Sequence, residues 1–454
     1  MSSTKLTPKQ LSWSSIIRDP AISKLLVNMA FSGLSYGVYN NLIYFFIPYL
    51  DKGVDSIGHF ALQYLVFQIA MSLALPIGGY LTDKMGRKPV LMMGSTAVAL
   101  GTFVLPLATE WWHIIYFSIG TAIGYALVSV AQNCVVADVT AEYRREKAYS
   151  ITMSFSMVFG VIGTVALIIY SFLYDGVLPN NTYYFLPSVS AAILAVLAAV
   201  PLFLIRIPRQ PPKDGPGCAG PPPKSDSSAS DPVNTLEQKQ LNEPPRNPLR
   251  NSVVLKILIF QGVIGFGAGF LVPLFNYFWR DLFKLPQPLI YTIALLGELG
   301  VAVGGLIAPM VSRRAKRLGG RVGTTIACQV ASIACAAYLA TVPYYLFLLP
   351  AVLAFIARQA LMNMVSPLMS ALTMDHTPVA QRGRVNSLTQ LIFNVPNGIS
   401  TNLSGRIIGS VPGNYGYTYS TLILVGTYIC GTALLSTTRK KDRLLVKQWK
   451  QAKE

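Results

Sequence analysis

The chain has 454 residues, of which 52% are hydrophobic and 12% charged, and its mean hydropathy is +0.47. Soluble proteins usually carry about 25% charged residues, so this composition excludes an ordinary soluble fold. The formal net charge of +18 comes from 37 Lys and Arg against 19 Asp and Glu. The composition predicts a protein with many membrane spans.

Apolar stretches recur along the whole chain, each long enough for the roughly 20 residues that one helical crossing needs. Polar turns separate them, and the pattern predicts twelve transmembrane helices in two sets of six. No cleavable signal peptide is predicted, because the first 24 residues are polar and the first span is long. The predicted spans are 25–50, 57–81, 89–109, 112–137, 147–173, 182–205, 253–279, 288–311, 322–342, 344–372, 385–410 and 417–437.

A polar segment rich in Pro, Ser, Gly, Lys and Asp separates the two sets. Such a composition cannot bury enough apolar surface to fold, so we predict a flexible linker. The predicted domains are an N-terminal six-helix bundle (1–205), a cytoplasmic linker (206–252), a C-terminal six-helix bundle (253–438) and a basic cytoplasmic tail (439–454).

Basic residues are distributed unevenly between the two sides of the predicted membrane. One side holds only Lys52, Arg280, Lys284 and Arg406, and Arg358 lies within a span, which leaves 32 of the 37 Lys and Arg on the other side. The positive-inside rule therefore places both termini and the linker in the cytoplasm of a cell-membrane protein. Orientation and attraction to anionic lipid head groups explain the net charge, so no nucleic-acid partner is predicted.

The two halves share a motif. The pattern D-x-T-x4-R-x-(K/R)-x2-S begins at Asp138 after the fourth predicted helix and at Asp375 after the tenth, 237 positions later. This spacing favours an internal duplication, with halves related by a pseudo-two-fold axis along the membrane normal. The predicted fold class is all-α, with twelve transmembrane helices in two pseudo-symmetric six-helix bundles.

The loop after the second predicted helix carries the most specific motif, Gly-Tyr-Leu-Thr-Asp-Lys-Met-Gly-Arg-Lys at residues 79–88. It closely resembles the signature G-x-L-x-D-(R/K)-x-G-R-(K/R) of the major facilitator superfamily, at the same place in a twelve-helix chain. The resemblance implies two bundles around a central cavity and a transporter that alternates between inward- and outward-open states. It also implies a conformational latch formed by Gly79, Asp83, Gly86, Arg87 and Lys88.

Asp83 is the acid of that latch, and the resemblance places its partner near Arg384–Ser387. Gly79 and Gly86 suit close packing and a tight turn, and Arg87 and Lys88 are expected at the anionic leaflet. The second half has no acid that corresponds to Asp83, so we expect an asymmetric latch.

Two departures limit the substrate class. Residues 116–122 lack the arginine that many proton-driven members carry in the fourth helix, and residues 159–164 have glycines without the proline typical of drug–proton antiporters. Ordinary drug–proton antiport is therefore less favoured.

Glu298 and Arg358 are the charged residues predicted to lie deep within spans. A charge at the bilayer centre costs at least about 2.5–3.5 kcal/mol, so each needs a partner or water. We predict that the two side chains lie close together, either as a structural pair or as part of a substrate or proton pathway, and both alternatives stay open.

Other polar residues mark where a cavity is expected. In the family, helices one, four, seven and ten line the central path, so Tyr36, Asn40 and Arg358 rank first, and Pro396 is expected to loosen the eleventh helix. Each polar residue has the alternative of a simple interhelical hydrogen bond. The candidate substrate or proton pathway comprises Tyr36, Asn40, Glu298, Arg358, Asn363, Asn394 and Asn397.

The predicted function is secondary transport of a small organic solute by rocker-type alternating access, with proton coupling left open. A facilitative uniporter or a drug or metabolite efflux protein is the alternative, and a non-transporting scaffold or sensor is a remote one. No P-loop is present to couple ATP, and neither the three His nor the five scattered Cys form a catalytic or metal-ligand pattern, so no enzyme activity, cofactor or metal is predicted. The expected partners are a small-molecule substrate, anionic lipid and, as an open alternative, protons, and the protein is expected to be a monomer.

Overall fold

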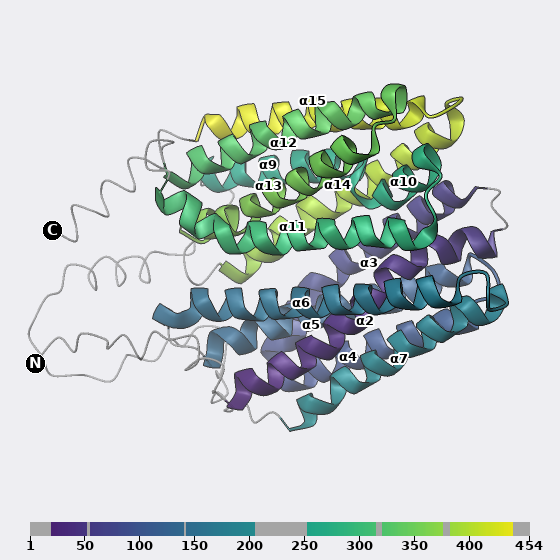
Figure 1. Cartoon of the computed structure of the whole chain (residues 1–454). Helices are drawn as coiled ribbons and strands as arrows, with labels where there is room; N and C mark the ends of the chain where they lie inside the picture. The colour runs from purple at the N-terminus through teal and green to yellow at the C-terminus, as the bar shows by residue number, and fades with distance from the viewer. Residues whose placement is uncertain are drawn as a thin grey trace, which may run out of the picture.

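The computed structural model describes residues 20–51, 55–139, 142–204, 252–314, 320–375 and 382–438, and within these ranges the regular structure is entirely helical. Two bundles lie side by side in Figure 1. The N-terminal bundle contains α2 (Pro20–Leu50), α3 (Ser56–Met85), α4 (Arg87–Val104), η2 (Leu105–Leu107), α5 (His113–Val139), α6 (Glu142–Tyr174) and α7 (Asn180–Phe203). The C-terminal bundle contains α9 (Ser252–Gly269), η4 (Val272–Leu274), α10 (Phe275–Phe283), α11 (Gln287–Arg314), α12 (Gly320–Tyr345), α13 (Leu348–Asp375), α14 (Arg382–Ser410) and α15 (Tyr415–Ser436).

The twelve predicted helices are present with ends shifted by a few residues, and one is broken. The seventh predicted span, 253–279, falls within one candidate membrane-crossing segment, Ser252–Phe283, but it is not one continuous helix: α9 ends at Gly269, and α10 begins at Phe275 after a short 3-10 turn. Pro273 lies in that turn, and its ring removes a backbone donor that an unbroken helix would need.

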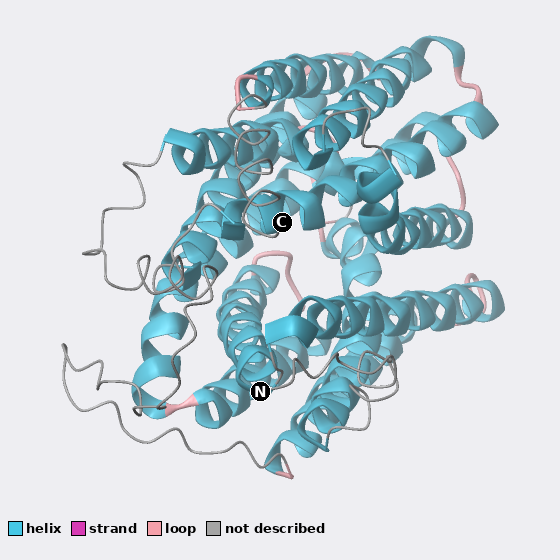
Figure 2. Cartoon of the chain, turned by 90° about the vertical axis from the view of Figure 1, so that its left-hand side faces the viewer, coloured by secondary structure: helices cyan, strands magenta, loops and turns pink. Residues whose placement is uncertain are grey.

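Two faces of the molecule are distinguished here by residues at their helix ends. The Gly86 face is where α2 begins and α3 ends at Met85, next to Gly86, and the Asp51 face is where α2 ends beside Asp51 and α3 begins. Figure 2 looks onto the Gly86 face, where the ends of both bundles are visible. Gly86 alone separates α3 from α4, and its φ of 87° is a conformation that glycine adopts readily.

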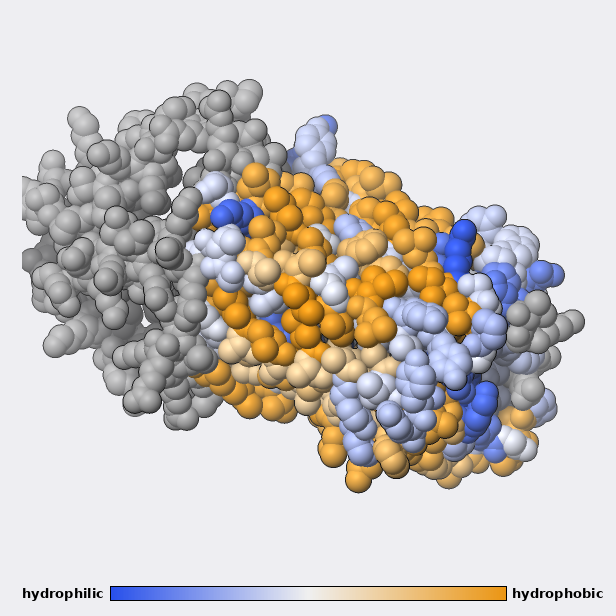
Figure 3. All heavy atoms as spheres, turned by 90° about the horizontal axis from the view of Figure 1, so that it is seen from above, coloured by the Kyte–Doolittle hydropathy of each residue, from blue (hydrophilic) through white to orange (hydrophobic). Residues whose placement is uncertain are grey.

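The outer surface has the character of a membrane protein. In Figure 3 a broad apolar surface covers the middle of the molecule, and hydrophilic residues gather at the Asp51 face. Ten helical segments in the described residues are long and apolar enough to cross a membrane. α2 and α14 are outside that set, and both carry many Asn and Ser side chains. These two helices lie at the contact between the bundles described below.

Close packing holds α2 against α6 in the N-terminal bundle. Gly33 and Gly37 of α2 face the backbone carbonyls of Ser156 and Gly160, so closely that a Cβ atom at either glycine would clash. Small residues at four-residue spacing allow two helix backbones to approach in this way.

The C-terminal bundle repeats this packing between α9 and α14. Gly265 and Gly269 of α9 face the backbone carbonyls of Phe393 and Asn397, again without room for a Cβ atom. The glycines follow their N-terminal counterparts by 232 positions and their partners by 237, the spacing of the repeated loop motif.

Hydroxyl groups continue this correspondence. The Thr164 hydroxyl of α6 lies 3.4 Å from the carbonyl oxygen of Gly37, and Thr401 of α14, 237 positions later, donates to the carbonyl of Gly269 at 3.0 Å. Two helix junctions of equivalent construction, α2–α6 and α9–α14, therefore face the middle of the molecule, one from each bundle. The predicted linker and tail lie outside the described residues, and their boundaries stay predictions.

Candidate functional site

The two bundles meet through two pairs of helices. α11 of the C-terminal bundle packs on α6, and α3 of the N-terminal bundle packs on α14. These two pairs are equivalent under the duplication, because each brings a helix of one bundle against the glycine-built junction of the other. The polar residues at these contacts form the candidate site.

Glu298 occupies the first contact. This α11 carboxylate accepts hydrogen bonds from the Thr164 hydroxyl at 3.1 Å and from the Asn41 amide at 3.4 Å. Asn41 also donates to Thr164 at 3.1 Å and to the carbonyl of Gly37 at 3.1 Å. An acid from one bundle is thus held by the α2–α6 junction of the other, and no described cation forms an ion pair with it.

Asn397 occupies the second contact, where the described hydrogen-bonding side chains are uncharged. Its side-chain oxygen accepts from the Tyr64 hydroxyl at 3.0 Å and from the Gln68 amide at 3.4 Å, both on α3. Its amide donates to the carbonyl of Gly265 on α9 at 3.0 Å. Gln68 also donates to Tyr64 at 2.7 Å, which completes a small network across the bundles.

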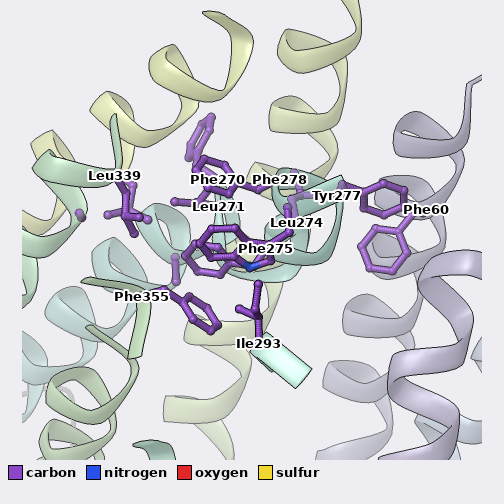
Figure 4. Packing of buried hydrophobic residues seen from close by; sticks show 14 of the residues in the cluster. Phe60, Phe270, Leu271, Leu274, Phe275, Tyr277, Phe278, Ile293, Leu339 and Phe355 are labelled. Carbon is purple, nitrogen blue, oxygen red and sulfur yellow. The ribbon is translucent and has the colours of Figure 1, made fainter. Parts of the chain in front are cut away.

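Aromatic rings close the space between the bundles toward the Asp51 face. Tyr44 and Phe60 of the N-terminal bundle lie with Tyr277 of α10 in one group, with ring centroids 4.6–6.0 Å apart. Figure 4 shows Phe60 and Tyr277 facing each other from the two bundles. Phe45 packs edge-to-face on Tyr291 at 5.1 Å. Arrangements of this kind are favourable for aromatic pairs.

Polar contacts at the start of α3 strengthen the same closure. Ser56 receives hydrogen bonds from Arg280 and from the Tyr277 hydroxyl, both at 3.4 Å, so α10 is attached to the first turn of α3. The break separates this short helix from α9, and Figure 1 shows α10 in the C-terminal bundle toward the right-hand end.

The same helix faces are open toward the Gly86 face. Gly79 continues the side of α3 that contacts α14, and Gly305 continues the side of α11 that carries Glu298. A Cβ atom at either glycine would meet nothing within 4 Å. Among the described residues, the hydrogen bonds between the bundles lie at mid-depth or toward the Asp51 face. The described contacts between the bundles therefore lie at mid-depth and at the Asp51 face, and none of them reaches Gly79 or Gly305.

The remaining predicted pathway residues differ in their surroundings. Tyr36 is 45% exposed, packs edge-to-face on Tyr125 at 6.1 Å and lies within electrostatic range of Glu298. Asn363 donates to the carbonyl of Gln359 in its own helix at 2.9 Å. Asn40 and Asn394 are partly buried and form no hydrogen bond within the part of the chain that the structure describes. Tyr36 thus belongs with the candidate site, whereas Asn363 is bonded within its own helix.

Arg358 does not pair with Glu298, and that expectation is corrected. Its guanidinium donates to Gln359 at 3.1 Å and to the Tyr428 hydroxyl at 3.2 Å, inside the C-terminal bundle. Glu298 instead turns out of that bundle toward α6. Gly297 and Gly300 occupy the face of α11 that packs on α13, so the neighbouring position 298 cannot also point there.

The latch residues lie at the Gly86 turn, as the motif indicates. Arg87 donates to the carbonyl of Thr82 at 3.2 Å, and Lys88 donates to the carbonyl of Phe203 at the end of α7 at 2.9 Å. Both cations therefore bind helix-end carbonyls of their own bundle. The side chain of Asp83 and those of Arg384 and the residues before it lie outside the described part, so the latch contact stays a prediction.

Four residues of the site escaped the sequence analysis: Asn41, Thr164, Tyr64 and Gln68. Asn41 follows the predicted Asn40, and one residue rotates a side chain by about 100° around a helix. Thr164 ends the glycine-rich stretch 159–164 of α6. The duplication could have identified Thr164 in the sequence, because Thr164 and Thr401 are 237 positions apart, like the junction residues Gly160 and Asn397.

A chain of two pseudo-symmetric helical bundles, with a polar contact between them at mid-depth, has the architecture of a membrane transporter rather than an enzyme. The family model described as Major Facilitator Superfamily matches residues 25–401. The chain therefore belongs to the major facilitator superfamily, as the motif at residues 79–88 indicated.

Several known proteins are similar to the chain. It is 24% identical over 409 residues to the multidrug resistance protein MdtG of Klebsiella pneumoniae, covering 87% of this chain and 88% of that protein. A match to the inner membrane transport protein YajR of Escherichia coli is 32% identical but spans 117 residues, about a quarter (24%) of each chain.

Solved structures share the fold at low identity. A D-xylose–proton symporter aligns with a TM-score of 0.72 at 12% identity, covering 91% of this chain and 97% of that one. The human organic anion transporter MFSD10 (TETRAN) aligns with a TM-score of 0.64 at 13% identity, covering 92% and 99%. At these identities the likeness establishes the fold alone.

Proposed function

We propose that the protein is a secondary transporter that moves a small organic solute by rocker-type alternating access, and that Glu298 couples this movement to a proton or to a cationic group of the solute. The observation that carries the proposal is the insertion of this C-terminal acid into the α2–α6 junction of the N-terminal bundle. We further propose that the Gly86 face is cytoplasmic, as the distribution of basic residues predicts.

The chemistry of the contact supports this coupling. Two neutral donors hold the carboxylate, and each hydrogen bond to a charged group contributes about 1.5–3 kcal/mol. If the bundles rotate apart at the Asp51 face, Glu298 leaves both donors. A proton or cation that binds the free carboxylate then favours the state in which the bundles are apart at the Asp51 face. A free-energy shift of about 1.4 kcal/mol changes the ratio of two states tenfold.

The two contacts between the bundles differ in charge, and we propose that they differ in function. Asn397, Tyr64 and Gln68 carry no charge, so their network is insensitive to pH near neutrality. Glu298 is the titratable member of the described contacts. A coupling site at one of the two contacts, and not at the other, is consistent with the asymmetric latch predicted from the sequence.

An efflux protein for drugs or metabolites is the alternative that a relative supports, whereas a facilitative uniporter is an alternative from the sequence alone. MdtG is named a multidrug resistance protein, and one structural neighbour is named a symporter of D-xylose and protons. A facilitator would not use Glu298 to build a gradient, so the coupled reaction distinguishes it from the proposal.

The test uses the full chain in proteoliposomes. A thermal-shift screen across metabolites, drugs and lipids first identifies a solute that stabilises the folded protein by mass action. Accumulation of that solute is then driven by an imposed pH gradient and compared with exchange at equal concentrations on both sides. We expect Glu298→Gln to lose accumulation while retaining exchange, and Glu110→Gln, the same change at an exposed loop acid, to retain both. Accumulation by Glu298→Gln equal to that of the wild type would refute the coupling role.

A further inference from the structure

Arg358 is a buried charge that the proposed transport cycle does not use. Its side chain is 1% exposed and lies over the rings of Phe275 and Tyr428, at 5.5 and 5.9 Å from their centroids. Hydrogen bonds to Gln359 and Tyr428 use part of its donor capacity, but its Nε has no partner in the described protein. No described carboxylate forms an ion pair with it.

A stripe of α12 adds more buried polar atoms without partners. Thr325, Gln329 and Ser332 recur at helical spacing and are 0–1% exposed. The hydroxyls of Thr325 and Ser332 and both amide atoms of Gln329 find no hydrogen-bond partner in the described residues. Buried polar groups are nearly always satisfied, so this concentration in one helix requires an explanation.

The stripe and the arginine belong to the same interior. α12 packs on α13, which carries Arg358, and on α15, which carries Tyr428. Cys335, one turn beyond Ser332, lies within electrostatic range of Arg358. The buried stripe therefore belongs to the helix that packs on both elements holding Arg358 and Tyr428.

The N-terminal bundle provides an internal comparison. The position 237 residues before Arg358 is Thr121, a buried hydroxyl that donates to the carbonyl of Phe117 at 2.9 Å. On α4, the counterpart of α12, the buried Thr102 donates to the carbonyl of Val98 at 2.8 Å. The position equivalent to Arg358 is thus filled by an uncharged, hydrogen-bonded hydroxyl, so the fold itself does not require a charge at this place.

We propose that Arg358 and the α12 stripe line an internal polar pocket that binds a small monovalent anion as the counter-charge of Arg358. A guanidinium does not lose its proton in proteins, so this residue cannot escape the cost of burial by becoming neutral. Water can satisfy the orphaned donors, but it leaves the charge uncompensated. A single anion of chloride size, or a carboxylate group, supplies one negative charge and accepts from Arg358, Ser332 and Gln329, directly or through water.

Anion-dependent stability of the purified protein tests the pocket. The melting temperature is measured in gluconate, chloride, bromide, nitrate and acetate at constant ionic strength. We expect a saturable rise with the small anions relative to bulky gluconate, because the polar atoms proposed to hold the anion are buried. Stabilisation by acetate at lower concentration than by chloride would assign the site to a carboxylate, and the reverse order would assign it to an inorganic anion.

Variants locate the effect. Arg358→Gln should abolish the anion dependence, whereas Arg406→Gln, at an exposed arginine of α14, should retain it. The double change of Gln329→Leu and Ser332→Ala keeps the charge and should raise the half-saturating concentration about tenfold or more. A wild-type melting temperature that does not depend on the anion would overturn the proposal. If Arg358→Gln does not fold, an unchanged half-saturating concentration in the double variant would overturn it as well.

Discussion

Glu298 shows how far a single residue can be interpreted from sequence. Its rarity as an acid within a span made it a candidate for either a structural pair or a substrate or proton pathway, because a charge in the membrane is costly. Its partner could not be identified by charge complementarity, because the direction of a side chain around a helix depends on packing. Gly297 and Gly300 turn one face of α11 toward α13 and so leave Glu298 to the other bundle.

The hydrogen bond from Thr164 to Glu298 gives the first prediction. Thr164→Val removes this donor and should cost about 1.5–3 kcal/mol in the state closed at the Asp51 face. The closed population should fall about tenfold or more. The rate at which an impermeant thiol reagent modifies a Ser56→Cys reporter at the Asp51 face measures this population.

Thr401→Val is the matched control for that prediction. Thr401 occupies the equivalent position and donates to the carbonyls of Gly269 and Asn397, not to an acid. It should leave the labelling rate close to that of the Ser56→Cys parent. Equal acceleration by both valine variants would show that helix packing, rather than Glu298, controls the closure.

The second prediction concerns the neutral contact. Tyr64→Phe removes the hydroxyl that donates to Asn397 at 3.0 Å but changes no charge. Solute exchange should slow or its KM should rise severalfold, since a neutral hydrogen bond contributes about 0.5–1.5 kcal/mol. The dependence of accumulation on the pH gradient should stay that of the wild type. A changed gradient dependence would show that the two contacts do not act separately.

At the level of helices, the length of the hydrophobic stretches predicted the positions of nearly all the helices. Eleven of the predicted spans correspond to single helices, because long apolar stretches have few alternatives in a membrane. The break between α9 and α10 was missed because residues 253–279 are predominantly apolar, and Pro273 was a weak signal beside that length. The glycine pairs that build both junctions were visible in the sequence, but their partners became clear only with the helices side by side.

The turn between α3 and α4 gives the third prediction. Asp83→Asn should shift the balance between the two transport states by about an order of magnitude and impair flux without unfolding the protein, because a charge-assisted contact contributes about 1.5–3 kcal/mol. Asp55→Asn is the control: this acid accepts from the backbone of Gly58 and caps the opposite end of α3. Accessibility probes that find unchanged populations in Asp83→Asn, with wild-type flux, would exclude a latch.

At the level of the whole molecule, orientation gives the fourth prediction. A cysteine placed in the predicted linker, as in Ser228→Cys, should react only from the cytoplasmic side. Cysteines placed at residues 51–55 should react only from outside. The experiment uses impermeant thiol reagents on intact cells and on inverted vesicles. Reversed labelling would place the Gly86 face outside and remove the basis of the positive-inside argument.

In the proposed mechanism, solute crosses the protein because the bundles open and close in turn. A single cross-link between the bundles tests this mechanism. A Cβ atom at Gly405 of α14 would lie 2.7 Å from the Cβ of Ala61 on α3, near the Asp51 face. Ala61→Cys with Gly405→Cys, in a chain whose five native cysteines are replaced by serine, should therefore form a disulfide after a small adjustment. Flux into proteoliposomes is measured before oxidation, after oxidation and after reduction. Oxidation should abolish flux and reduction should restore it, with each single-cysteine variant unaffected. Full flux through the fully oxidised protein would contradict alternating access.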